Sequence, residues 1–448
     1  MLKVSVSGIR GIWGESLNHE KIIEYTKAFV KIIGENSKII LGCDTRKTRD
    51  IIKSLVVSVL ESYGCEVLDL EIVPTPLVLY GVKKLNADGG IMISASHNPS
   101  CWNALKLIKK GGFFFNQQDV DLLKKTIKEK NYLKFNHENL GSIKVYTNLL
   151  KDYIQDAKGL IDFSLIRSKN FKVIADVVNG TAIKFIPTLF KLLDLKFEIL
   201  FDDINKEFER EAEPLPNHLT VLSEKVKSNN ANLGLAYDPD ADRLALVDEL
   251  GNAVGEDWTL ALAYLNVLDK EKSDIVVNLS TSMIIDRIAK SNSKQVYRAK
   301  VGEINVTEKM LELESVIGGE GNGGVIYPKI NFCRDSIIAT LMVLEYLARH
   351  DKTLSSVVKQ YPKYFFLKEK IQIGDDLSFD NIKAVIEKTL KELDLRLESV
   401  NLEDGIRIEY SGGWIQVRAS NTEPVIRIMG ENKDEKINHT LLEALKNG

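Results

Sequence analysis

The sequence predicts an α/β protein that has three similar α/β domains and a smaller α+β domain at the C-terminal end. Three observations support this fold class: a strand–helix–strand pattern occurs three times, the C-terminal stretch follows another pattern, and the chain has 448 residues. At about 150 residues per domain, this length indicates about three domains and allows a large buried core. We expect domain boundaries that divide the chain into residues 1–145, 146–252, 253–365 and 366–448.

The three repeats share one design: a short apolar run, a polar turn, an amphipathic helix and a second short apolar run. In each helix, apolar residues recur at i, i+3 and i+4, as they do along one face of an α-helix. Short apolar runs with flanking caps are typical of strands buried in a parallel sheet. The expected strand, helix and strand cover 38–42, 51–60 and 66–70 in the first repeat, 172–175, 183–193 and 197–200 in the second, and 275–277, 284–288 and 295–297 in the third.

The C-terminal stretch is expected to form a small α+β domain. Two of its apolar runs alternate on either side of Ser411-Gly412-Gly413, a composition typical of turns, which predicts a β-hairpin. The expected elements are a helix over 379–393, strands over 406–410, 414–418 and 425–429, and a closing helix over 437–445.

Composition and charge limit the classes of protein and partner. Hydrophobic residues make up 44% and charged residues 27% of the chain, which excludes a disordered, collagenous or membrane protein. The net charge is −3, so we expect no nucleic-acid partner and no binding to an acidic membrane. No long apolar run occurs, and the N-terminal residues lack the apolar region of a signal peptide. Because the four cysteines lack CxxC spacing, we expect reduced thiols and a cytoplasmic location, and the oligomeric state stays open.

The first candidate motif places Ser96 beside His97 in Ser94-Ala95-Ser96-His97-Asn98-Pro99, with Asn103 and Lys106 shortly after it. A serine beside a histidine suggests a nucleophile and a base, but adjacent side chains diverge. The sequence also has no GxSxG elbow, so a hydrolase triad is unsupported. An ordinary turn is the alternative, because Ser, Asn and Pro are common turn residues.

The second motif has Asp238, Asp240 and Asp242 at alternate positions, followed by Arg243. Three such carboxylates can converge on one hard cation. A calcium hand is disfavoured because Arg243 stands at the sixth position, where the sharp turn needs glycine. A Mg²⁺ site beside a phosphate, with Arg243 facing the phosphoryl group, explains the pattern better. A solvated acidic turn is the alternative.

The third motif, residues 318–324, has five glycines in seven residues, and its backbone can therefore approach a ligand closely. Its Glu320 and Asn322 can form hydrogen bonds with sugar hydroxyls, although a plain flexible turn would have a similar composition.

In the fourth motif, Arg418 and Arg427 bracket a turn that contains Ser420, Asn421 and Thr422. Two guanidinium groups together with hydroxyl and backbone N–H donors can hold a phosphate. No Walker or Rossmann motif occurs, so this is not a nucleotide-type phosphate loop. A surface turn without an anion is the alternative.

With these four motifs in this order, the chain resembles the α-D-phosphohexomutase superfamily, from Ser7-Gly8-Ile9-Arg10-Gly11 to the arginine-bracketed turn. The resemblance implies three similar α/β domains with mixed sheets plus a smaller C-terminal α+β domain, arranged around a central cleft that holds the active site. It also implies Mg²⁺ as the cofactor and a phosphorylated hexose or hexosamine as the partner.

The resemblance assigns roles residue by residue. Ser96 matches the serine that carries a phosphoryl group, and it is expected to complete a metal shell with Asp238, Asp240 and Asp242. The expected catalytic residues are Ser96, Lys106, Arg243 and His97. The expected substrate-binding residues are Arg10, Lys300, Glu303, Glu320, Asn322, Arg418, Ser420, Asn421, Thr422 and Arg427.

Three features depart from the motifs common in the family. Ala104 follows Asn103 where many members have glycine, and Asn322 and Gly324 replace a serine and a histidine of the sugar loop. Glu303 stands where phosphomannomutase/phosphoglucomutase enzymes have a histidine. The general base therefore stays open. The Gly-Glu-Gly-Asn-Gly-Gly form favours phosphoglucosamine mutase activity, with phosphomannomutase/phosphoglucomutase activity as the alternative.

The implied reaction moves a phosphate between O6 and O1 of a hexose through phospho-Ser96 and a 1,6-bisphosphate. Phosphoryl transfer depends on positioning and charge neutralisation, which Lys106 and Arg243 can supply. Two other classes compete with it: a metal-dependent phosphatase that uses water as acceptor, and a non-catalytic sugar-phosphate-binding protein. The presence of Ser96, Lys106 and all three aspartates argues against the non-catalytic protein.

Overall fold

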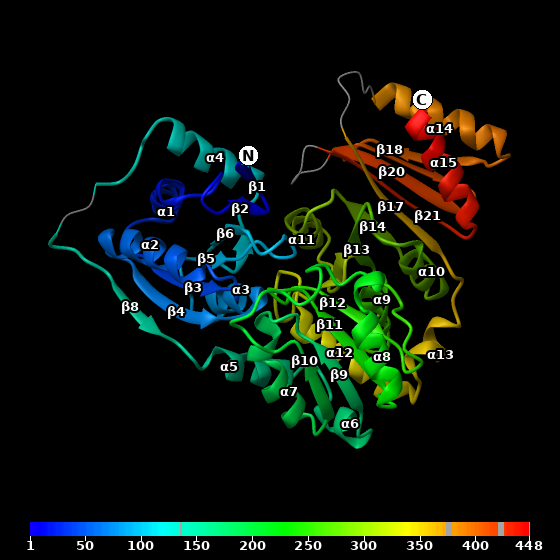
Figure 1. Cartoon of the computed structure of the whole chain (residues 1–448), viewed down its shortest axis with the longest axis horizontal. Coiled ribbons are helices and arrows are strands. Elements are labelled where there is room, and N and C mark those ends of the chain that lie inside the picture. The colour runs from blue at the N-terminus through cyan, green and yellow to red at the C-terminus, as the bar shows by residue number, and fades with distance from the viewer. Residues whose placement is uncertain (135–136, 373–378, 420–424, 448) are drawn as a thin grey trace.

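The structure, a computed structural model, describes residues 1–134, 137–372, 379–419 and 425–447. Within these residues there are four β-sheets, and each takes its strands from one continuous part of the chain (Figure 1). We call these parts the first to fourth domains. The first three combine mixed sheets with helices, and the fourth is a smaller α+β domain, so the predicted fold class is confirmed.

The first domain has eight strands and four helices. The strands are β1 (Lys3–Ser5), β2 (Gly8–Ile12), β3 (Lys38–Cys43), β4 (Glu66–Ile72), β5 (Gly89–Ile93), β6 (Trp102–Lys109), β7 (Phe113–Phe114) and β8 (Ser142–Val145), and the helices are α1 (His19–Ile33), α2 (Arg49–Ser62), α3 (Thr75–Lys84) and α4 (Gln117–Lys128). The sheet order is β1-β2-β6-β5-β3-β4-β8, and β7 pairs with β6. Strands β5, β3, β4 and β8 run parallel, whereas β6 is antiparallel to its neighbours.

The second and third domains each have a four-stranded sheet. The second contains α5 (Leu149–Ala157), α6 (Phe163–Ser168), β9 (Lys172–Asp176), the 3₁₀ turn η1 (Thr181–Lys184), α7 (Ile186–Leu192), β10 (Lys196–Leu200), the 3₁₀ turn η2 (Pro216–His218), α8 (Thr220–Ser228), β11 (Leu233–Tyr237) and β12 (Leu244–Val247). The third contains α9 (Asp257–Leu268), β13 (Ile275–Asn278), α10 (Met283–Ser291), β14 (Val296–Ala299), α11 (Glu303–Glu312), β15 (Gly318–Glu320), β16 (Gly324–Ile326), α12 (Ser336–His350) and α13 (Leu354–Val358).

One four-strand unit recurs in the three α/β domains. Its order is β4-β3-β5-β6 in the first domain, β10-β9-β11-β12 in the second and β14-β13-β15-β16 in the third. In each unit three strands run parallel and the last is antiparallel. The loop before the antiparallel strand covers residues 94–101, 238–243 and 321–323, respectively. The serine, aspartate and glycine-rich motifs therefore occupy equivalent loops.

The second repeat differs from its prediction in one respect. The expected helix over 183–193 forms as two pieces, the 3₁₀ turn η1 and the helix α7, which meet at Phe185. Pro187 lies in the first turn of α7. Because proline has no backbone N–H and is tolerated only at the start of a helix, the helix begins again just before it.

The fourth domain has a five-stranded antiparallel sheet and two helices. Its elements are β17 (Phe365–Gln372), α14 (Phe379–Glu392), β18 (Leu397–Asn401), β19 (Ile406–Tyr410), β20 (Gly413–Ala419), β21 (Val425–Asn432) and α15 (Glu435–Asn447). The order is β17-β21-β20-β19-β18. The predicted hairpin is confirmed, because β19 and β20 pair up to Tyr410 and Gly413. Strands β17 and β18 were not predicted.

The first three domains share one continuous apolar core, which includes Ile40, Tyr153, Tyr237 and Ile337. Helix α12 packs against α9 and α6, and every residue from 336 to 348 is buried. The fourth domain has a separate core. Apolar burial stabilises a fold by about 25 cal/mol per Å². The shared core therefore fixes the first three domains to one another more firmly than to the fourth.

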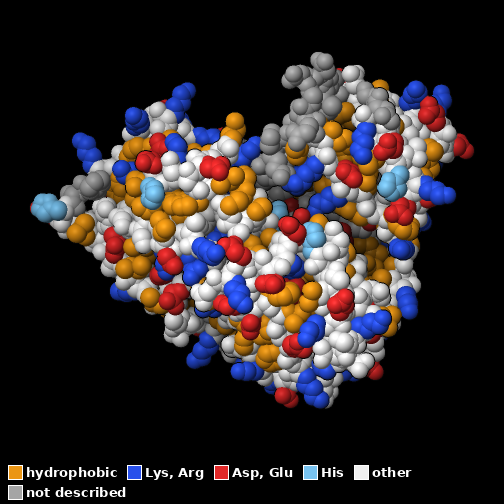
Figure 2. Space-filling model, viewed as in Figure 1, with side chains coloured by type: hydrophobic (Ala, Val, Ile, Leu, Met, Phe, Trp, Pro, Cys, Tyr) orange, Lys and Arg blue, Asp and Glu red, His pale blue; other side chains and the backbone are white. Residues whose placement is uncertain are grey.

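Polar contacts connect the fourth domain to the third. Ser280 Oγ donates to Gln416 Oε1 at 2.7 Å, and the carboxylate of Glu431 accepts a hydrogen bond from the backbone N–H of Met283 at 2.6 Å. Charged side chains of both signs are interspersed over the visible face of the molecule (Figure 2). Among the described residues, no helix is both long and apolar enough to cross a membrane.

Candidate active site

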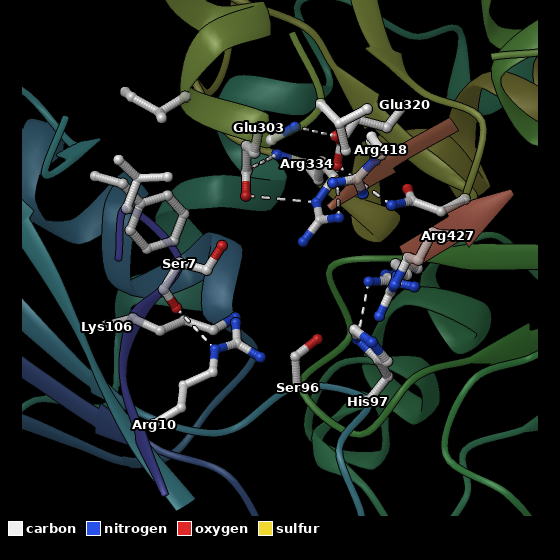
Figure 3. A pocket seen from close by; sticks show the side chains of 17 residues that line it. Ser7, Arg10, Ser96, His97, Lys106, Glu303, Glu320, Arg334, Arg418 and Arg427 are labelled. Carbon is white, nitrogen blue, oxygen red and sulfur yellow. Dashed lines mark hydrogen bonds and ion pairs between the residues drawn. The ribbon is translucent and has the colours of Figure 1, made fainter. Parts of the chain in front are cut away.

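A pocket lies where the four domains meet, and eight of its 17 lining residues carry charged side chains (Figure 3). The first domain contributes Ser7, Arg10, Ser96, His97 and Lys106, the second Arg243, the third Glu303, Glu320, Asn322 and Arg334, and the fourth Arg418 and Arg427. Most of the predicted site residues that the structure describes are therefore brought together. All four domains contribute residues to this pocket.

Ser96 lies in the loop between β5 and β6, in a left-handed backbone conformation with φ of 49°. Its backbone N–H donates to Ser94 Oγ at 2.9 Å, and its Oγ donates to Asp238 Oδ2 at 3.0 Å. Positive φ is uncommon for residues other than glycine and needs support from its surroundings. The loop thus holds the Ser96 hydroxyl against the aspartate loop of the second domain.

Arg46, which the sequence analysis did not single out, supports the serine loop. Its guanidinium group donates to the carbonyl oxygens of Ser96, Asn98, Pro99 and Trp102 at 2.5 to 3.1 Å, and its Nε pairs with Asp44 at 2.9 Å. Both charged side chains are completely buried. A signal for Arg46 existed, because it lies four residues after the predicted strand over 38–42, in the loop where polar residues often face a site in α/β folds.

Asp238, Asp240 and Asp242 each offer an oxygen, and these oxygens lie within 4.8 Å of one another. All three side chains are buried. Among the described residues, Asp240 Oδ1 and Asp242 Oδ1 have no hydrogen-bond partner. Buried carboxylate oxygens without partners are costly, and oxygen donors of this kind suit a hard divalent cation. This cluster could therefore hold a metal ion.

Neighbouring charges shift the pKa values of Asp238 and Asp240 in opposite directions. Burial, together with the charges of Asp242 and Asp240, raises the pKa of Asp238 well above its usual value. Burial also acts to raise the pKa of Asp240, but Lys106 Nζ, at 2.5 Å from Asp240 Oδ2, lowers it below the usual range. Lys106 is also 3.6 Å from Asp242 Oδ2. One lysine of the first domain thus neutralises part of the aspartate loop of the second.

Arg243 connects the serine loop to the fourth domain. Its Nη2 donates to His97 Nδ1 at 2.9 Å, and its Nη1 lies 3.3 Å from Glu213 Oε1. Lys368, on β17, pairs with the same Glu213 oxygen at 2.8 Å. Burial, and then the charge of Arg243, lower the pKa of His97 well below 6.5, so His97 is neutral at neutral pH. Neither Glu213 nor Lys368 was predicted from the sequence.

Arg10 lies beside the serine loop, as expected. It donates from Nη1 to the Ala95 carbonyl at 3.2 Å and to Asn98 Oδ1 at 2.9 Å, and from Nε to the Ser7 carbonyl at 2.9 Å. Its guanidinium therefore helps to shape the loop and still lines the pocket.

Glu320, the last residue of β15, and Asn322, in the loop before β16, both line the pocket, and Figure 3 shows Glu320 there. Glu320 Oε1 accepts hydrogen bonds from Asn278 Nδ2 at 2.8 Å and from the Gly302 backbone at 3.0 Å. Asn322 Nδ2 donates to Glu320 Oε2 at 3.3 Å, and Asn322 Oδ1 has no partner among the described residues. These groups can accept and donate hydrogen bonds to a polar ligand.

Lys300, which was predicted to bind substrate, does not lie with the other predicted site residues. It follows the last residue of β14, its side chain is exposed, and it is not among the residues that line the pocket. By contrast, Arg334, which the sequence analysis missed, lines the pocket between Glu303 and Glu320. No local motif identifies Arg334, because it simply precedes Asp335, the N-cap of the buried helix α12.

Arg418 and Arg427 lie directly opposite each other on β20 and β21. Arg418 is only 5% exposed; its Nη1 donates to the Ala419 carbonyl, and its Nε has no partner among the described residues. Like charges directly opposite each other destabilise a strand pair, so this arrangement suits an anion. Ser420, Asn421 and Thr422 lie outside the described residues.

Family models match nearly the whole chain. The α/β/α domains I, II and III of phosphoglucomutase/phosphomannomutase match residues 1–134, 151–251 and 256–364. The C-terminal domain of the same family matches residues 376–447. The four matches follow one another in the order found in the structure.

Curated relatives resemble the chain over its full length. A phosphoglucomutase/phosphomannomutase of Thermococcus kodakarensis is 32% identical over 442 residues, which is 97% of this chain and 96% of the relative. A phosphoglucosamine/phosphogalactosamine mutase of Sulfurisphaera tokodaii is 30% identical over 444 residues, covering 98% and 97%.

Solved structures share the fold. A phosphoglucomutase/phosphomannomutase family protein of Burkholderia thailandensis has a TM-score of 0.82 at 23% identity, with 100% of this chain and 98% of that chain covered. An N-acetylphosphoglucosamine mutase of Aspergillus fumigatus, in complex with glucose 1,6-bisphosphate, has a TM-score of 0.61 at 14% identity, covering 99% and 94%.

The family models and the full-length relatives together show that the chain is a phosphohexomutase. The chain belongs to the phosphoglucomutase/phosphomannomutase family, within the α-D-phosphohexomutase superfamily, and is an isomerase.

Replacing Arg46 with lysine should destabilise the first domain and reduce activity. Lysine cannot form the planar fork that reaches four carbonyl oxygens, and each lost hydrogen bond to a charged group costs about 1.5–3 kcal/mol. Thermal unfolding and steady-state kinetics of Arg46→Lys measure both effects. Arg49→Lys is the matched control, because Arg49 donates hydrogen bonds to two carbonyls, those of Thr45 and Arg46, and otherwise pairs with the exposed Asp50 at 3.7 Å. Equal behaviour of the two variants would contradict this role.

Proposed function

We propose that this phosphohexomutase interconverts glucosamine 6-phosphate and glucosamine 1-phosphate, with Ser96 as the residue that carries the phosphoryl group. The observation that carries the proposal is the position of Ser96 Oγ, 3.0 Å from Asp238 Oδ2 and in the same pocket as Arg418 and Arg427. A phosphoryl group on Ser96 would face the aspartate cluster, and a second phosphate would meet the arginines of the fourth domain.

In this proposal, phospho-Ser96 donates its phosphoryl group to the free oxygen of the sugar phosphate and forms a 1,6-bisphosphate. The bisphosphate turns end for end and returns its other phosphate to the Ser96 hydroxyl. Each transfer breaks one P–O bond and forms another, so no phosphate is released. Positioning and charge neutralisation provide most of the catalysis in such transfers.

Lys106, Arg243 and Arg10 are the cations proposed to neutralise the phosphoryl group that is transferred to and from Ser96. Lys106 and Arg243 lie beside the aspartate loop, and Arg10 lies beside the serine loop. In a pocket with little water, fixed cations stabilise the negative charge of the transition state strongly. His97, which is neutral and accepts a hydrogen bond from Arg243, is proposed to orient that guanidinium toward the phosphoryl group.

Mg²⁺ is the metal we propose for the aspartate cluster. The fit rests on three buried carboxylates whose oxygens lie within 4.8 Å of one another and on the two oxygens that lack hydrogen-bond partners among the described residues. Asp238, Asp240 and Asp242 would hold the ion, with Ser96 or its phosphate adjacent. When bound, Mg²⁺ neutralises charge on phosphoryl oxygens.

The choice of sugar rests on the relatives. The Sulfurisphaera tokodaii relative is named for phosphoglucosamine and phosphogalactosamine, and six archaeal relatives of 30–32% identity carry the name "Probable phosphoglucosamine mutase". Phosphomannomutase/phosphoglucomutase activity is the second candidate, because the Thermococcus kodakarensis relative has that name.

The sugar preference can be measured directly with the wild-type enzyme. We expect kcat/KM to be highest for glucosamine 1-phosphate when glucose 1-phosphate and mannose 1-phosphate are compared under the same conditions, each after phosphorylation of the enzyme by a hexose 1,6-bisphosphate. A higher value for either neutral sugar would overturn the proposed substrate and favour the second candidate.

Ser96→Ala should lose the protein-bound phosphoryl group and reduce turnover by on the order of 10³ or more, since a nucleophile is removed. Intact mass before and after incubation with a hexose 1,6-bisphosphate, together with coupled kinetics, tests this. Ser100→Ala, in the same loop but outside the pocket lining, is the control. Release of inorganic phosphate at the rate of sugar turnover by the wild type would instead identify a phosphatase.

Arg418→Ala should reduce kcat/KM for the 1-phosphate and the 6-phosphate alike, by about ten- to a hundredfold, the cost of one charge-assisted hydrogen bond. The reason is that each phosphate of the intermediate meets this arginine in turn. Phosphorylation of Ser96 should persist, because Ser96 belongs to the first domain. Kinetics in both directions provide the measurement, with the exposed Arg396→Ala as control. Unchanged kinetics would show that Arg418 does not hold substrate.

A further inference from the structure

The third domain forms the part of the pocket between the two groups of phosphate-binding cations. Arg10 and Lys106 lie on one side with Ser96, and Arg418 and Arg427 come from the fourth domain (Figure 3). Between them, the third domain presents two carboxylates and one guanidinium group: Glu303, Glu320 and Arg334. A hexose whose phosphates occupy the two cationic sites would place its ring beside these three groups.

Arg334 is shared among three carboxylates that come from the aspartate loop, the start of helix α11 and the end of strand β15. Its Nη2 donates to Asp242 Oδ2 at 2.7 Å, its Nη1 to Glu320 Oε2 at 2.9 Å, and its Nε lies 3.4 Å from Glu303 Oε2. Glu303 Oε1 accepts a hydrogen bond from the Arg334 backbone at 2.5 Å. Arg334 therefore orients both carboxylates that face the ring, Glu320 through its guanidinium group and Glu303 through its backbone N–H and the nearby charge.

Gly324 makes this position of Arg334 possible. A Cβ atom on residue 324 would lie 2.2 Å from Arg334 Cδ and 2.7 Å from Arg334 Cγ. The aliphatic stem of Arg334 thus occupies the space that any side chain at position 324 would take. The observed position of the Arg334 side chain therefore requires glycine at position 324.

Among the third-domain groups, the single guanidinium of Arg334 faces two glutamates, Glu303 and Glu320. Burial acts to raise the pKa of Glu320, but Arg334, with the hydrogen bond from Asn278, lowers it below its usual value, so Glu320 is ionised. For Glu303, burial outweighs the attraction of Arg334 and raises the pKa to about 7, so Glu303 is partly protonated at neutral pH, and a cation placed beside it would favour its carboxylate form. Arg334 also neutralises Asp242, so its single charge does not balance both glutamates.

We propose that Glu303, positioned by Arg334, is the specificity residue that pairs with the ammonium group of a hexosamine phosphate. This inference rests on the proposed function and identifies the group that reads the amino sugar. An ammonium group supplies the missing positive charge and three N–H donors to a carboxylate whose side chain is only 11% exposed. A hydroxyl in the same place can donate one hydrogen bond but brings no charge.

The experiment compares glucosamine 1-phosphate, N-acetylglucosamine 1-phosphate and glucose 1-phosphate as substrates of the wild type and of Glu303→Gln, after equal phosphorylation by glucose 1,6-bisphosphate. Glutamine keeps the oxygen that accepts from the Arg334 backbone but removes the negative charge. We expect kcat/KM for glucosamine 1-phosphate to fall about ten- to a hundredfold, and the values for the two uncharged sugars to change far less. The readout is the ratio of kcat/KM for glucosamine 1-phosphate to kcat/KM for the uncharged sugars, which would not change if Glu303 only supported the structure.

Two further variants complete the test. Glu312→Gln, which removes an exposed carboxylate from the same helix α11, should leave the ratio unchanged. Gly324→Ala, which displaces the stem of Arg334, should lower the preference for the amino sugar, and it tests the proposal even when Glu303→Gln does not fold. Thermal unfolding of each variant monitors folding.

The outcomes separate this inference from the proposed function. A wild type that prefers glucosamine 1-phosphate and a Glu303→Gln variant with the same preference would overturn the role of Glu303 while the proposed function stands. A wild type without that preference would overturn both. A preference that is lost in Glu303→Gln and lowered in Gly324→Ala would support the ammonium–carboxylate pair.

Discussion

Three aspartates are buried in one loop with their oxygens within 4.8 Å of one another, and the arrangement of the domains follows from the need to neutralise them. Buried carboxylates are tolerated only when they are paired with cations or hydrogen-bond donors. The second domain supplies the aspartates, but Lys106 comes from the first domain and Arg334 from the third. The charge of the loop is therefore balanced only when all three domains are in place.

The repeated sheet architecture explains why the pocket forms at the junction of the domains. The serine loop, the aspartate loop and the glycine-rich loop occupy equivalent positions in three copies of one four-strand unit, and a continuous apolar core packs these copies together. The fourth domain has its own core and presents two arginines on neighbouring strands. The fourth domain therefore contributes positive charge to the pocket and contacts the third domain through polar groups.

Much of this could be predicted from the sequence because the signals are local. Strand 38–42 was predicted from a short apolar run, and the helix over 284–288 from its apolar spacing; the structure has them as β3 and α10. The predicted helix over 183–193 was wrong in its continuity, because the segment forms a 3₁₀ turn and a separate helix that meet at Phe185, just before Pro187. The alternate spacing of the aspartates was enough to predict a cation site, because ligand type and spacing are properties of one short segment.

Arg46, Arg334 and Glu213 show the limit of this approach. Each acts on residues 30 to 92 positions away, and none belongs to a motif of its own. The same limit applies to Lys300, which lies only three positions before Glu303 yet is exposed and outside the pocket lining. Spacing along the chain does not say which side chains face a cavity formed by other domains.

By itself, the sequence determined the fold class, the order of the domains and the segments that contribute to the site, because strand and helix periodicity and short motifs are encoded within a few residues. Only the tertiary structure decided which charges meet: that Lys106 faces Asp240, that His97 receives a hydrogen bond from Arg243, and that the stem of Arg334 fills the space beside Gly324. The first two contacts join residues from different domains, and their electrostatic energies depend on burial and on distances of a few ångströms, whereas the third is a steric fit within the third domain. Such quantities exist only in the folded chain.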